Sequence, residues 1–79
     1  MKLRTDQQIN AFQKAIDECS MPVWLISVEG EEYNMKKTAD RYMGIARLLS
    51  DDTEELELFA SNDSDEMIMM DFYRNYCMC

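Results

Sequence analysis

Two cysteines one residue apart are the side chains of this sequence best suited to soft-metal or disulfide chemistry. Cys77 and Cys79 form a Cys-Met-Cys triplet, and the third thiol, Cys19, lies far from them along the chain. Thiolates bind soft metals and attack disulfides, but they need a further ligand or a basic neighbour, and Arg74 is the nearest basic residue. The pair is therefore either a thiol or soft-metal site or two free thiols in a frayed terminus. An odd cysteine count argues against a disulfide framework and favours reduced thiols in the cytoplasm.

Carboxylates dominate the charged residues, and histidine is absent. The 79 residues include 16 Asp and Glu against 8 Lys and Arg, which leaves a net charge of −8 at pH 7. This charge repels nucleic-acid phosphates and anionic lipid, and the missing histidine excludes imidazole ligation and histidine general-base catalysis. The adjacent carboxylates Asp51–Asp52 and Glu54–Glu55 lack the spacing of an EF-hand loop. We therefore predict no metal, no cofactor, no small-molecule substrate and no enzymatic activity.

The first half of the chain predicts a helix followed by a β-hairpin. Thr5 and Gln8 have the spacing of a capping box, and apolar residues three or four apart then predict a helix over residues 6–19. The apolar stripe of this helix consists of Ile9, Phe12, Ile16 and Cys19. Residues 23–28 are mostly apolar on both faces, which is typical of a central strand. Gly30 suits the following turn because glycine tolerates a positive φ.

The second half predicts a return strand, two helices and one more strand. The strands cover residues 31–35 and 54–60. The helices cover residues 38–49 and 65–76. Gly44 lies inside the first of these helices, where it costs about 1 kcal/mol relative to alanine and indicates a close packing contact. The residues expected on one apolar face of that helix are Tyr42, Ile45, Ala46 and Leu49.

The order helix–strand–strand–helix–strand–helix predicts a single α+β domain over residues 1–79, a two-layer sandwich of three helices on a small, mainly antiparallel sheet. This order and three segments resemble HPr, the phosphocarrier of the bacterial sugar phosphotransferase system. Residues 24–36 look like the family's strand, turn and short strand, residues 42–46 resemble its Ile-Met-Gly-Val segment, and residues 56–61 resemble its last strand. The resemblance covers about residues 9–76 and implies an HPr-like fold.

The residues that carry phosphoryl groups in HPr are replaced in this sequence. The family's phosphorylatable histidine falls near Thr5, and the arginine and proline that follow it in the family are absent. The family's regulatory serine falls at Lys37 or Arg41, depending on where a gap is placed. The resemblance therefore implies a domain that is not competent for histidine phosphotransfer. Thr5 is either a helix N-cap or the acceptor of a degenerate phosphocarrier.

The family's first strand is also missing, because only Met1 to Arg4 precede the first helix. In HPr that strand pairs with the last strand, so its loss places residues 54–60 at an edge with unpaired backbone groups. Glu55, Glu57 and Phe59 are expected to point outward from this strand. Three kinds of strand could pair with this edge: the N-terminal segment, the same strand of another copy, or a strand of a partner protein. Alternatively, the charged side chains of Glu55 and Glu57 protect the edge from pairing.

These features predict a non-catalytic, HPr-like regulatory or protein-interaction domain in a bacterial cytoplasm. No apolar run has the length of a signal peptide or a membrane span, the longest being residues 22–26. The expected partner is another protein or a second copy, and an acidic domain favours a basic or apolar surface. The alternatives are a thiol or soft-metal protein that uses Cys77 and Cys79, and a degenerate phosphocarrier.

Overall fold

The computed structural model describes residues 2–50 and 56–77 and has the element order expected from the sequence. The elements are α1 (Asp6–Glu18), β1 (Val23–Ser27), β2 (Glu32–Asn34), α2 (Thr38–Leu49), β3 (Leu56–Ala60) and α3 (Asp63–Tyr76). The predicted α+β class, with three helices and an antiparallel sheet, is confirmed. Within the described residues, no helix is both long and apolar enough to cross a bilayer.

The sheet has three strands in the order β2–β1–β3, and both pairings are antiparallel. β1 lies in the centre, as its two apolar faces predict, and its Leu25 lies opposite Tyr33 of β2 and Leu58 of β3. Gly30 has a φ of 92° in the turn between β1 and β2, a conformation that glycine adopts without strain. Because β3 pairs with β1 on one side, its other side is an edge of the sheet formed by the described residues.

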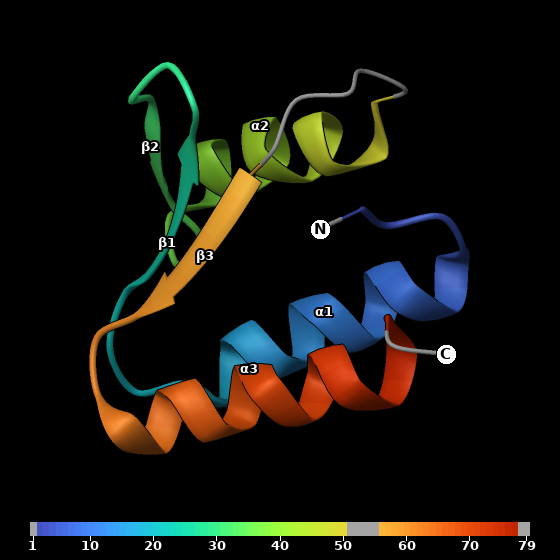
Figure 1. The fold of residues 1–79 in the computed structure, drawn as a ribbon, viewed down its shortest axis with the longest axis vertical. Helices are drawn as coiled ribbons and strands as arrows, with labels where there is room; N and C mark the ends of the chain where they lie inside the picture. Colours follow the sequence, from blue (N-terminus) through green and yellow to red (C-terminus); the bar gives the residue numbers. More distant parts are fainter. Residues whose placement is uncertain (1, 51–55, 78–79) are drawn as a thin grey trace.

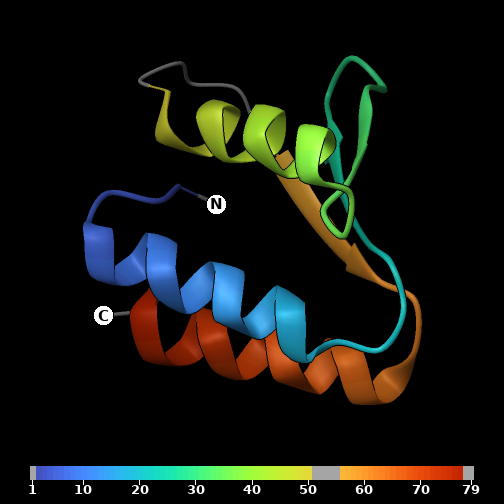
Figure 2. The ribbon, with the colours of Figure 1, turned by 180° about the vertical axis from the view of Figure 1, so that it is seen from behind.

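The three helices pack on one face of this sheet, and α1 and α3 lie side by side (Figures 1 and 2). The Phe12 and Phe72 rings, from α1 and α3, have centroids 5.4 Å apart. The buried apolar residues come from all six elements and their flanks: Leu3, Phe12, Ala15, Ile16, Cys19, Val23, Leu25, Tyr33, Met35, Leu48, Leu56, Met69 and Phe72. The stripe predicted for α1 lies in this core, with Ile9 only partly buried.

The apolar face predicted for α2 is wrong. Its members are exposed or only half-buried: Tyr42, Ile45, Ala46 and Leu49. Gly44 and Leu48 are the buried residues of this helix. A Cβ on Gly44 would lie 2.7 Å from Met35 Sδ and 3.1 Å from Leu25 Cδ2. The helix therefore approaches the sheet through Gly44, which has no side chain and adds nothing to a hydrophobicity pattern, and through Leu48. Tyr42 and Leu49 turn toward solvent, and Ile45 is only partly buried.

A buried carboxylate connects α3 to the loop between α1 and β1. Asp65 is 2% exposed, and its two oxygens accept the backbone N–H groups of Ser20 at 3.0 Å and Met21 at 2.9 Å. The hydrogen bond from Ser20, assisted by that from Met21, lowers the pKa of Asp65 against the opposing effect of burial. Because the ionised carboxylate accepts with both oxygens, it holds the start of α3 against the chain that leads into β1.

Candidate functional site

Thr5, the residue at which the resemblance to HPr would place the histidine, is a helix cap. Thr5 is the N-cap of α1, and its Oγ1 accepts the backbone N–H of Gln8 at 3.1 Å. The Gln8 side chain accepts the backbone N–H of Thr5 at 3.2 Å in return, which completes the predicted capping box. The Thr5 hydroxyl oxygen thus has a structural role, and no described hydrogen bond prepares it as a nucleophile.

The two positions of the family's serine lie at the start of α2. Lys37 is the exposed N-cap of α2, and its backbone N–H donates to the carbonyl of Asn34 at 2.9 Å. The Arg41 guanidinium donates to the carbonyl of Met35 at 2.7 Å and forms an ion pair with Asp17 at 2.8 Å. Arg41 lines a cavity of about 640 Å³ between α1 and α2 that includes neither Thr5 nor Lys37. The three phosphosite positions therefore do not form one site.

The described thiols do not form a reactive centre. The Cys19 thiol is buried and donates to the carbonyl of Ala15 at 3.3 Å, and burial, followed by the Asp65 carboxylate, raises its pKa. Cys77 is half-buried at the end of α3. Cys79, Glu55 and the carboxylates of residues 51–54 lie outside the described residues. No group of three metal-ligating side chains occurs in the described chain, so the Cys77–Cys79 alternative stays a prediction.

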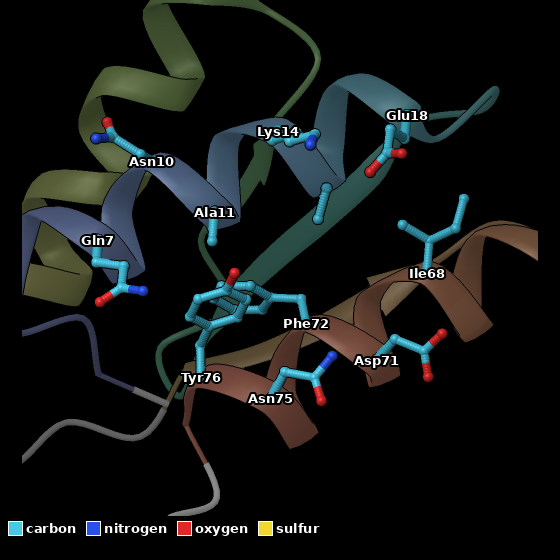
Figure 3. Close-up of a pocket in the computed structure, with 11 residues that line it drawn as sticks. Gln7, Asn10, Ala11, Lys14, Glu18, Ile68, Asp71, Phe72, Asn75 and Tyr76 are labelled. Carbon is cyan, nitrogen blue, oxygen red and sulfur yellow. The ribbon is translucent and has the colours of Figure 1, made fainter.

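A shallow groove of about 790 Å³ runs between α1 and α3. Figure 3 shows the Phe72 and Tyr76 rings in it, with the amides of Gln7 and Asn75 close by. These two rings stack with centroids 5.7 Å apart, and Gln8 Nε2 donates to the Tyr76 carbonyl at 2.7 Å. The groove is the seam of two packed helices, and it contains no nucleophile next to a base among its lining residues.

The outer side of β3 is one of the two edges of the sheet formed by the described residues, and the direction of its backbone hydrogen bonds follows from β1. The N–H of Met35 donates to Val23 at 2.8 Å and the N–H of Ser27 donates to Glu31 at 2.9 Å, so alternate residues of β1 face β2. In an antiparallel ladder the residues between them, Trp24 and Ile26, must face β3.

The same alternation sets the direction of each residue in β3. Glu57 lies opposite Ile26 and Phe59 lies opposite Trp24, so their backbone groups bond to β1. The backbone N–H and C=O groups of Leu56, Leu58 and Ala60 point away from the sheet. No hydrogen bond to these groups is found within residues 2–50 and 56–77. An edge with unpaired groups is a template for another strand.

An apolar groove of about 450 Å³ lies beside this edge, between β3 and α3. Its lining residues are Leu56, Leu58, Ala60, Glu66, Met69, Met70, Tyr73 and Arg74. Met70 is 53% exposed and Tyr73 is 43% exposed, although they are large apolar side chains. The three residues with outward backbone groups thus also direct their side chains toward the groove.

The described N-terminal residues and the opposite edge of the sheet have fewer unpaired backbone groups than β3. Leu3 is buried and donates its N–H to the carbonyl of Leu48 at 3.1 Å, so the described N-terminal residues bond to α2. At the other edge of the sheet, the Asp40 carboxylate accepts the N–H of Asn34 in β2 at 3.0 Å. Among the described strands, β3 therefore has the longer open edge.

The sequence predicted which side chains of β3 lie on the outer face of the sheet, but not which residues direct their backbone groups to the open edge. Glu57 and Phe59 are exposed on the outer face of the sheet, with Phe59 46% exposed. The outward backbone groups belong to Leu56, Leu58 and Ala60, and the groove adds residues of α3. The strict alternation of β3 and the cluster of methionines in α3 were the available signals.

Comparisons of the chain with models of protein families, with curated proteins and with solved structures found no match. The resemblance to HPr therefore rests on the sequence features given above and stays a prediction.

Proposed function

We propose that this chain is a non-catalytic protein-interaction domain of the cytoplasm, HPr-like but without histidine phosphotransfer, that binds an extended segment of a partner along β3. The observation that supports this function most directly is the row of outward backbone groups at Leu56, Leu58 and Ala60 beside an apolar groove. Such a row and such a groove are the two parts of a site for strand addition, in which backbone bonds give affinity and side-chain pockets give specificity.

The spacing of this edge fits a peptide backbone. Alternate residues of a strand are about 6.6 Å apart, so outward N–H and C=O groups repeat at that interval and match another strand but not a compact ligand. Each added backbone hydrogen bond contributes about 0.5–1.5 kcal/mol net. Because the edge is short and association costs several kcal/mol, we expect weak and reversible binding.

A display library of random ten-residue peptides tests this function before any natural partner is identified. We expect the selected peptides to carry apolar residues at every second position and to bind as extended segments. Selection of peptides with apolar residues three and four apart, typical of a docked helix, would contradict strand addition.

Two methionines of α3 provide a matched pair of variants for the selected peptides. Met70 lines the groove, whereas Met67 is 66% exposed and is absent from its lining. Met70→Gln removes about 1 kcal/mol of apolar contact and should weaken binding about fivefold, and Met67→Gln should leave it unchanged. Equal effects of the two substitutions would place the peptide elsewhere.

A further inference from the structure

The free edge of β3 carries negative charge on both sides. Glu57 is exposed on the outer face of β3, and Glu66 lines the groove from α3. Arg74 is the basic residue of the groove lining, and its guanidinium already contacts the Asp71 carboxylate at 3.5 Å. The whole chain has a net charge of −8. A segment that approaches this edge therefore meets carboxylates with little basic compensation.

The register determines which side chains of an added strand meet which part of the site. Partner residues opposite Leu56, Leu58 and Ala60 share their face of the sheet, so their side chains enter the apolar groove. Partner residues opposite Glu57 and Phe59 direct their side chains to the outer face. Cross-strand neighbours have Cβ atoms about 5 Å apart, which is close enough for a charge pair with Glu57.

We infer that the segment bound at β3 comes from another protein and alternates apolar residues, which enter the groove, with Lys or Arg residues, one of them opposite Glu57. This inference rests on the function proposed above. A second copy of the chain fits less well, because symmetric antiparallel pairing centred on Leu58 places Glu57 opposite the partner's Phe59 and brings no basic residue to it. It also brings together two chains of −8 each.

The test uses short synthetic peptides and the intact chain in reductant at low ionic strength. The first peptide, Ser-Ile-Lys-Val-Lys-Ile-Ser with blocked ends, has the inferred alternation. The second replaces both lysines with glutamates. A third has N-methylated valine, whose N–H points to β3 when the peptide adds antiparallel with its valine opposite Leu58. A fourth is N-methylated at one lysine, whose N–H points away from β3.

We expect the glutamate peptide to bind about tenfold more weakly than the lysine peptide, with the difference shrinking at high salt. Methylation of the valine should weaken binding about tenfold, whereas methylation of the lysine should have little effect, because only the first removes a bond to the edge. Equal binding of the lysine and glutamate peptides would overturn the charge preference and leave strand addition standing. Equal effects of the two methylations would overturn strand addition itself.

Two glutamates in one cross-strand row provide matched variants of the chain. Glu57 and Glu32 both lie opposite Ile26, on β3 and β2 respectively, and both are exposed. Glu57 is one strand spacing from an added strand, whereas Glu32 is three spacings from it, a distance of about 14 Å. This distance exceeds the Debye length, which is about 8 Å at 0.15 M salt. At 0.15 M salt, Glu57→Lys should reverse the peptide preference, and Glu32→Lys should preserve it. A preserved preference in Glu57→Lys would overturn the inference.

The oligomeric state separates the partner segment from a second copy. Light scattering over a concentration series should show a monomer for the free chain in reductant. A dimer that Leu58→Lys dissociates would identify a second copy as the occupant of the edge and overturn the inference.

Discussion

Leu58 lies directly opposite Leu25 in the antiparallel register, yet the two residues do not exchange backbone hydrogen bonds. Leu25 belongs to the residues of β1 that bond to β2, so Leu58 directs its N–H and C=O away from the sheet. The packing of Leu58 against the core and the open edge are therefore consequences of the same pairing. A strand added at Leu58 would extend the sheet without displacing a bond that the described chain makes.

The close approach of α2 to the sheet predicts the effect of a methyl group at Gly44. Alanine favours helix by about 1 kcal/mol, but its Cβ would lie 2.7 Å from Met35 Sδ, and overpacking a buried site costs about 1–3 kcal/mol. We expect Gly44→Ala to lower the free energy of unfolding by about 1 kcal/mol, measured by urea denaturation.

Shortening Met35 provides the control for this clash. In a Met35→Ala background the sulfur is gone and only the contact with Leu25 Cδ2 at 3.1 Å remains, so Gly44→Ala should lose its destabilising effect. A destabilising effect of equal size in both backgrounds would show that the cost does not come from the contact with Met35.

The buried carboxylate of Asp65 predicts an acid-sensitive step in unfolding. Its pKa is lowered in the folded chain by the hydrogen bonds from Ser20 and Met21. A group with a lowered folded pKa stabilises the fold above its ordinary pKa, and this contribution is lost as pH falls through the folded value. Asp65→Asn should therefore destabilise the chain at pH 7, with a smaller difference from the unmodified chain below pH 4.

Asp63, in the first turn of the same helix, is the matched control for this effect. Asp63 is exposed, so Asp63→Asn should change stability much less at pH 7. A difference between the Asp65→Asn variant and the unmodified chain that stays constant from pH 7 to pH 3 would contradict the assigned role of the carboxylate.

The cap at Thr5 predicts a structural response to substitution. Thr5→Ala removes the oxygen that accepts the Gln8 N–H and should cost about 1 kcal/mol of unfolding free energy, whereas Thr5→Ser should restore it. Incubation with the phosphotransferase enzymes and labelled phosphoenolpyruvate should transfer no label to either form. Label on the threonine chain that disappears in Thr5→Ala would instead support the degenerate phosphocarrier.

The terminal cysteines give a simple test of the thiol alternative. Replacing Cys77 and Cys79 with serine should leave peptide binding at β3 unchanged, because Cys77 does not line the groove. Soft-metal uptake should be equally weak before and after the replacement when measured by titration with a thiophilic ion. Stoichiometric uptake that the replacement abolishes would support the thiol function.

The elements were predictable because their apolar residues repeat with a helix or strand period and have clear caps and turns. Thr5, Gly30 and the two-sided apolar pattern of β1 are such signals. The orientation of α2 was not predictable, since it depends on a close approach at Gly44. Nor was the role of Asp65, whose carboxylate accepts from backbone donors 45 and 44 residues away in the sequence.

The candidate site was predictable only in part. An edge at β3 follows from the element order, but the direction of each N–H depends on which residues of β1 bond to β2. The contribution of Met70 and Tyr73 depends on where α3 lies relative to β3, which their spacing along the chain does not determine.

Amide hydrogen exchange of three consecutive residues tests the central claim most directly. In the free chain, the N–H of Leu58 should exchange at least tenfold faster than those of Glu57 and Phe59, which bond to β1 (about 1.4 kcal/mol of protection). Saturation with the alternating lysine peptide should lower the exchange rate of the Leu58 amide to the rates of the Glu57 and Phe59 amides. Equal protection of all three amides in the free monomer, or a Leu58 amide that stays fast in the peptide complex, would contradict an open docking edge at β3.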